Sequence, residues 1–115
     1  MEIRERRAES NEKISKRDII IDGQTVGKVE IAFDGRVAHI SNVELNSHRN
    51  ERYGIKVAIQ IGEELAAKGI TLHSGSNISP DGIRLCDSLV RIGRMKITTH
   101  PRHENQQVYE YIPIS

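Results

Sequence analysis

A basic loop followed by an amphipathic run is the part of the sequence best suited to bind an anionic ligand. Residues 48–55 read HRNERYGI, with Arg49 and Arg52 in the loop and Lys56 directly after it. The first turn of a helix leaves backbone N–H groups unpaired at the positive end of the helix dipole, so this loop would form a seat for a phosphate group. A basic loop before a helix is also a common solvated connection, and the residues alone leave both interpretations open.

The spacing of apolar residues predicts the helix that this loop would enter. Val57, Ile61 and Leu65 recur every four residues, and Gly69 ends the run. Such a pattern is typical of an amphipathic helix of about four turns with a glycine at its C-terminal cap.

Three strands are predicted before this helix. β-Branched runs separated by the turn dipeptides Asp22-Gly23 and Asp34-Gly35 divide residues 18–45 into an antiparallel meander. In residues 37–45, strict alternation would place five side chains on one face: Val37, His39, Ser41, Val43 and Leu45.

The elements after the helix complete a mixed sheet. Residues 70–72 predict a short buried strand, and Ser79-Pro80-Asp81 predicts the start of a second helix that ends near Arg91. Residues 95–99 and 108–114 predict a C-terminal hairpin. A helical crossover makes the strands on either side of it parallel. The expected fold class is therefore α/β (α+β), with an antiparallel meander, a β-α-β crossover, a second helix and a final hairpin.

Length and composition favour one small domain. The chain has 115 residues, and its 17 Lys and Arg against 16 Asp and Glu give no overall field that would attract nucleic acid or an anionic membrane. Residues 1–17 carry six basic and four acidic side chains, which predicts a polar arm or short helix before a single domain at 18–115. One cysteine and no long apolar run favour a cytoplasmic protein without disulfides.

From Asp18 to Ser115 the chain resembles the GNAT superfamily of acyl-CoA-dependent N-acyltransferases. The segment 49–54 matches the family signature at Arg49 and at Gly54, and the spacing from Gly54 to Gly69 follows that of the family's helix. Asn77 and the segment 85–89 (LCDSL) look like the family's later Asn and its Leu-Tyr-x-x-Leu segment.

The resemblance implies that acetyl-CoA is the cosubstrate. Backbone amides of the loop would hold its pyrophosphate, and backbone groups of residues 43 and 45 would pair with its pantetheine arm. The cofactor-binding residues implied in this way are Val43, Leu45, Arg49, Asn50, Arg52, Tyr53, Gly54, Ile55 and Asn77.

The chain departs from the family pattern at four places, one of which is a segment up to Gly93 that is longer than usual. Arg52 replaces the first signature glycine, so a side chain lies where the backbone usually approaches phosphate. Cys86 replaces the tyrosine that protonates the leaving thiolate in many members, and a buried apolar role is the alternative for it. The family's first strand and two helices have no counterpart in residues 1–17, so the acceptor site is expected to be open or completed by another chain.

A base must take the proton of an amine acceptor. Glu44 and His39 are the candidates on the strand at 37–45, with Cys86 as the candidate acid. Glu44 would face away from Val43 and Leu45, toward solvent. A surface carboxylate and a partly buried histidine are the alternatives for these two residues.

Three functions remain open from the sequence. The first is an N-acetyltransferase that acts on a protein or peptide amine by direct attack on the thioester. The second is a catalytically inactive GNAT-fold protein-binding module, and the third is a nucleic-acid binder that uses the basic loop. Tyr109 and Tyr111 could form a homodimer or acceptor surface, whereas His100 and His103 lack a third ligand for a metal.

Overall fold

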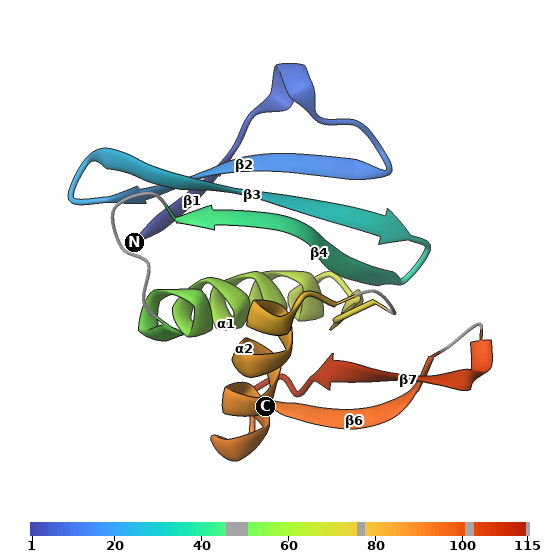
Figure 1. Cartoon of the computed structure of the whole chain (residues 1–115). Coiled ribbons are helices and arrows are strands. Elements are labelled where there is room, and N and C mark those ends of the chain that lie inside the picture. The colour runs from blue at the N-terminus through green and yellow to red at the C-terminus, as the bar shows by residue number, and fades with distance from the viewer. Residues whose placement is uncertain (46–50, 76–77, 101–102, 115) are drawn as a thin grey trace.

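The computed structural model describes residues 1–45, 51–75, 78–100 and 103–114. One mixed sheet of seven strands, in the order β1-β2-β3-β4-β5-β7-β6, packs against two helices (Figure 1). The elements are β1 (Glu2–Glu5), the short 3-10 turn η1 (Arg7–Glu9), β2 (Ile14–Ile21), β3 (Gln24–Asp34), β4 (Val37–Leu45), α1 (Glu51–Ala67), β5 (Thr71–His73), α2 (Pro80–Arg91), β6 (Met95–His100) and β7 (His103–Tyr111).

This arrangement confirms the predicted fold class. β2, β3 and β4 form the antiparallel meander, α1 crosses over to β5, and β5 runs parallel to β4. β6 and β7 form the C-terminal hairpin. Neither described helix has the length and apolar character that a membrane span needs.

The N-terminal segment differs from the expected polar arm or short helix. Residues Glu2–Glu5 form the edge strand β1, which pairs antiparallel with β2, and β2 already begins at Ile14. Ile3 packs against the core, and Arg6 Nε donates to Asp18 Oδ1 at 2.9 Å. The sequence pattern did not predict this strand, because an edge strand with one solvated face tolerates many charged residues.

The apolar stripe of α1 packs as its periodicity predicts. Val57, Ala58, Ile61 and Leu65 are buried, and they share one core with residues of the sheet and of α2. Gly62 lies under the Tyr111 ring, where a Cβ atom would approach ring carbon Cδ2 within 2.6 Å. The glycine therefore allows the last strand to pack directly on the helix.

An irregularity in β4 changes which side chains face the helices. Asn42 pairs with Glu30, but the next pair joins Ile40 to Ile31, so Ser41 is an extra residue in β4. Val43 and Leu45 therefore face α1, whereas His39 lies on the opposite, outer face. The predicted common face for residues 37–45 is wrong, because a bulge resets the two-residue period.

Candidate functional site

A cleft opens where β4 and β5 separate. The two strands pair only between Val37–His39 and Thr71–His73, and beyond these residues no described strand lies on the free edge of β4. The opening leads into a cavity of about 360 Å³. We call it the β4–β5 cleft, and its lining comprises Ile40, Ser41, Asn42, Val43, Leu45, Gly54, Val57, Ala58, Leu72, His73, Ser74, Ile78, Ser79, Gly82, Leu85, Cys86, Leu89 and Met95.

The free edge of β4 gives this cleft backbone donors and acceptors. Each strand residue has one N–H and one C=O, and those that point away from β3 in residues 41–45 have no strand partner in the described chain. An amide-containing ligand could add to this edge as another strand would. The structure places Val43 and Leu45, two residues of the expected cofactor site, in the lining.

Only part of the predicted phosphate loop can be placed. Arg49, Asn50 and Asn77 lie outside the described residues, as does the side chain of Arg52. α1 begins at Glu51, directly after the loop, as the predicted phosphate seat requires. The assignment of these residues to phosphate binding stays a prediction.

The first turns of α1 contribute to the lining of the cleft. Gly54 belongs to the lining, and a Cβ atom at this position would lie 3.3 Å from Leu85 Cδ1. Ile55 packs against the core, and Lys56 Nζ lies 5.5 Å from the centre of the Tyr53 ring. A glycine at position 54 therefore leaves space between the two helices.

A buried histidine lies where β4 and β5 separate, which we call the narrow end of the cleft. His73 ends β5, and its side chain is only 7% exposed. Gly75 N donates to His73 Nδ1 at 2.9 Å. Burial, together with the neighbouring His39 and His100, lowers the pKa of His73 to about 4. His73 is therefore neutral at physiological pH.

The two base candidates lie on the outer face of β4. His39 pairs with His73 across the strands, with 5.8 Å between the ring centres. Glu44 is exposed and pairs with Lys28 of β3, so it faces away from the cleft lining as expected. The bulge at Ser41 separates the two candidates, and the structure places His39 nearer to the narrow end of the cleft.

Cys86 reaches the cleft but is a poor acid. Its side chain is buried, and burial, followed by the charge of Asp87, raises the pKa of the thiol to about 11. The residue packs with Leu89 and Met95 in the apolar core. These contacts favour the apolar role over proton transfer.

The environment of Cys86 predicts slow alkylation. Because the thiolate is the reactive form, iodoacetamide at about pH 8 should modify the folded protein far more slowly than the urea-unfolded chain, by about 100-fold or more. Intact-mass measurements over time would follow the reaction. Comparable rates for the folded and unfolded chains would show that the thiol is accessible and ionised.

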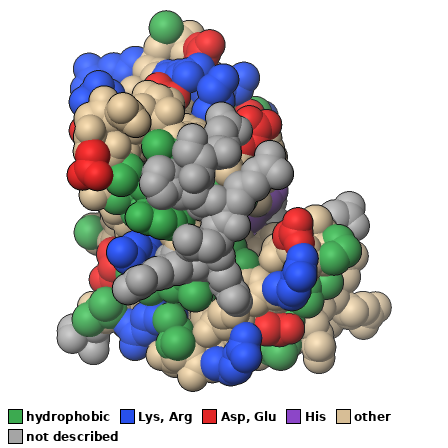
Figure 2. All heavy atoms as spheres, turned by 60° about the vertical axis from the view of Figure 1, so that its left-hand side comes forward, with side chains coloured by type: hydrophobic (Ala, Val, Ile, Leu, Met, Phe, Trp, Pro, Cys, Tyr) green, Lys and Arg blue, Asp and Glu red, His purple; other side chains and the backbone are tan. Residues whose placement is uncertain are grey.

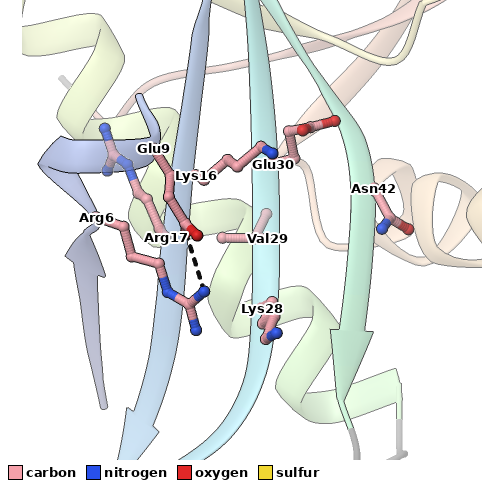
Figure 3. Close-up of a pocket in the computed structure, with 8 residues that line it drawn as sticks. All are labelled: Arg6, Glu9, Lys16, Arg17, Lys28, Val29, Glu30 and Asn42. Atoms are coloured by element: carbon pink, nitrogen blue, oxygen red, sulfur yellow. Dashed lines mark hydrogen bonds and ion pairs between the residues drawn. The ribbon is translucent and has the colours of Figure 1, made fainter. Parts of the chain in front are cut away.

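A second, polar cavity lies on the outer face of the sheet (Figure 3). It measures about 260 Å³ and lies between η1 and strands β2, β3 and β4. Two of its lining residues, Arg6 and Glu9, form an ion pair at 3.1 Å, and Arg6 also pairs with Asp18 outside the lining. Asn42 lines both this cavity and the β4–β5 cleft, so the two spaces adjoin at the bulge.

Basic side chains gather on one part of the surface near these cavities (Figure 2). Figure 2 shows Lys and Arg side chains gathered at the top of the molecule, over η1 and the strands beside it, with apolar side chains below them. Among the described residues, no three His, Cys, Asp or Glu side chains come together as metal ligands.

Sequence reasoning missed His73 and Asn42. His73 directly follows the short apolar run 70–72, and the carboxyl end of a parallel strand is a usual ligand position. This position at the end of a predicted parallel strand could have identified His73 as a candidate site residue. Asn42 gave none, because its place at the junction of two cavities depends on the bulge.

Comparison with known proteins supports the fold. No protein-family model and no curated protein sequence matches the chain. Among solved structures, the chain is similar to PaiA N-acetyltransferase from Thermoplasma acidophilum in complex with coenzyme A, with a TM-score of 0.60 and 15% identity. This match covers 91% of the chain and 64% of that protein.

Two further structures show the same similarity. The ribosomal-protein-S18-alanine N-acetyltransferase from Escherichia coli has a TM-score of 0.60 and 12% identity, over 95% of this chain and 76% of that one. Aminoglycoside acetyltransferase AAC(6')-Ib in complex with coenzyme A and kanamycin has a TM-score of 0.59 and 14% identity, over 86% of this chain and 66% of that one. The chain has the GNAT fold.

Proposed function

We propose that the protein is an acyl-CoA-dependent N-acetyltransferase that acts on a protein or peptide amine. The observation that carries this proposal is the β4–β5 cleft, which combines an unpaired strand edge with the first turn of α1. Structural neighbours crystallised with coenzyme A support acetyl-CoA as the cosubstrate. Their acceptors differ, so the acceptor is proposed from this chain's own features.

Each part of the cleft suits one part of acetyl-CoA. Backbone N–H groups at the start of α1, with Arg49 and Arg52, would hold the pyrophosphate. Backbone groups of Val43 and Leu45 would pair with the amides of the pantetheine arm, beside the apolar wall formed by Val57. The thioester would then lie toward the narrow end of the cleft.

The reaction requires an amine on the outer face of the sheet. Its nitrogen attacks the thioester carbonyl carbon, a C–N bond forms, the C–S bond breaks and coenzyme A leaves as a thiolate. His39 or Glu44 would accept the ammonium proton, and solvent would protonate the thiolate. The high pKa of Cys86 makes it a poor donor for that last step.

The outer face favours an extended acceptor. The polar cavity adjoins the cleft at Asn42 and is open to solvent on this face. Its mixed charges would accommodate a polar peptide chain more readily than an apolar metabolite. A protein or peptide amine is therefore the proposed acceptor.

Calorimetric titration with acetyl-CoA tests the site. Val43 is 40% exposed in the cleft, and a V43E substitution would add a carboxylate where an anionic ligand binds. We expect V43E to weaken binding at least about 10-fold, or about 1.4 kcal/mol. R49E should weaken binding as well, through the phosphate loop.

The matched control is I97E. Ile97 is an exposed aliphatic strand residue on β6, outside the cleft lining, so I97E should bind acetyl-CoA like the wild type. Equal binding by V43E and wild type would refute the cleft as the cofactor site. Folded protein without any binding at millimolar acetyl-CoA would instead support a protein-binding module.

A further inference from the structure

His73 stands at the point where β4 and β5 separate. The pair His39–His73 is the last one between these strands, and His73 belongs to the lining of the β4–β5 cleft. The start of α1, where an anionic group would bind, follows the opposite end of β4, after Leu45 (Figure 1). The histidine therefore lies where the acyl end of a bound thioester would come to rest.

One hydrogen bond fixes the tautomer of His73. Because Gly75 N donates to Nδ1, the proton of the neutral ring must reside on Nε2. The neutral form persists because the side chain is buried between His39 and His100, and the opposing charges of Glu110 and Asp34 are weaker influences on its pKa. His73 is therefore an N–H donor of fixed orientation.

This donor is free to bind a ligand. No described group accepts a hydrogen bond from Nε2. Within the described chain, the only fully enclosed side-chain nitrogen or oxygen without a partner is Arg94 Nη1, so Nε2 of His73 keeps contact with open space. His73 is 7% exposed and lines the β4–β5 cleft, so a ligand in the cleft is the group that we expect to meet this N–H.

We infer that His73 Nε2–H donates a hydrogen bond to the carbonyl oxygen of the acyl group of a thioester bound in the β4–β5 cleft. This inference rests on the proposed function. When the amine attacks, the carbonyl electron pair moves to this oxygen, and it returns when the C–S bond breaks. A neutral donor held in place before the reaction stabilises that charge without itself losing a proton.

A single neutral N–H suits the carbonyl oxygen better than a phosphate. Phosphate groups are bound by several donors together with positive charge, and both are offered at the start of α1. His73 contributes neither a charge nor a second donor, because its Nδ1 already accepts from Gly75. A single neutral donor is therefore what we expect at the narrow end of the cleft, where the carbonyl oxygen would lie.

Nitrogen NMR of the histidine rings tests the inference on the full chain. Long-range ¹H–¹⁵N spectra should show His73 as the Nε2–H tautomer at neutral pH. Acetyl-CoA should then shift the Nε2–H resonance, whereas free coenzyme A, which lacks the thioester carbonyl, should leave it in place. Backbone amide shifts at Gly54 and Val57 report cofactor binding independently.

The outcomes separate the inference from the proposed function. Suppose that both ligands shift the amide resonances of α1, but the His73 resonance responds to neither ligand or equally to both. The inferred contact with the carbonyl oxygen is then wrong, and the cleft remains the proposed cofactor site. If neither ligand shifts any resonance, the proposed function fails and the inference fails with it. An Nδ1–H tautomer would overturn the inference directly.

Two substitutions provide a kinetic readout. H73Q keeps an N–H group near the position of Nε2, whereas H73F keeps the ring shape and removes the donor. With a peptide amine as acceptor, H73F should lower kcat about 100-fold while KM for acetyl-CoA changes little, and H73Q should recover most of the loss. Equal losses in both variants would indicate a packing role and refute the donor.

Discussion

Replacing Gly27 with alanine should lower the free energy of unfolding by about 3 kcal/mol. A Cβ atom at this position would lie 2.0 Å from the backbone oxygen of Glu44 and 3.1 Å from Leu45 Cα. These atoms belong to the neighbouring strand and cannot rotate away as a side chain would. The alanine must therefore push β3 and β4 apart next to the β4–β5 cleft, and urea unfolding followed by circular dichroism would measure the cost.

The same substitution at Gly54 is the matched control. Its nearest neighbour would be Leu85 Cδ1 at 3.3 Å, the end of a flexible side chain, and alanine favours the helix over glycine by about 1 kcal/mol. G54A should therefore be as stable as the wild type or more stable. A loss below about 1 kcal/mol for G27A would contradict the close approach of β3 and β4.

Acidification should destabilise the protein through His73. The pKa of this residue falls from 6.5 to about 4 on folding, because of burial first and then the nearby His39 and His100. The unfolded chain therefore binds the proton more readily. The residue does not change the free energy of unfolding above about pH 6.5, and it lowers this free energy as the pH falls toward about 4, by about 3 kcal/mol in total.

Unfolding curves measured between about pH 7.5 and about pH 4 would isolate this contribution. H73F cannot take up the proton, so its stability should fall by about 3 kcal/mol less than that of the wild type over the range. H103Q is the control, because His103 is an exposed member of the same group of rings, 4.7 Å from His100. Parallel curves for wild type and H73F would show that His73 does not titrate below its ordinary range.

Most of the fold follows from local pattern. The period of four from Val57 to Leu65 predicts α1, the Ser79-Pro80 start predicts α2, and a helical crossover leaves little choice but a parallel β4–β5 pair. The edge strand β1 could not be predicted in this way. Its stability comes from pairing with β2 and from the Arg6–Asp18 contact, which are long-range interactions without a local signal.

The candidate site was less predictable than the fold. Arg49 and Gly54 predicted a phosphate seat at the start of α1 because such a seat has a recognisable local sequence, and this assignment stays a prediction. No local sequence pattern predicts which β4 side chains face the helices. One extra residue, Ser41, shifts the register, so the side chains after it alternate in the opposite sense to those before it. His73 acquires its character only through burial among rings that come from other strands.

The short strand β5 also bears on how the sheet deforms. Among the described residues, it pairs with three residues of β4 and with β7 through His73 and Glu110, next to a hydrogen bond from Ser74 N to Tyr109 O. The sheet thus consists of two leaves, β1–β4 and β6–β7, joined by a narrow strip with few ladder bonds. Bending at this strip would leave most backbone hydrogen bonds within β1–β4 and within β6–β7 intact. Widening of the cleft would therefore break few ladder bonds, and the common core with α1 and α2 would still hold the two leaves together.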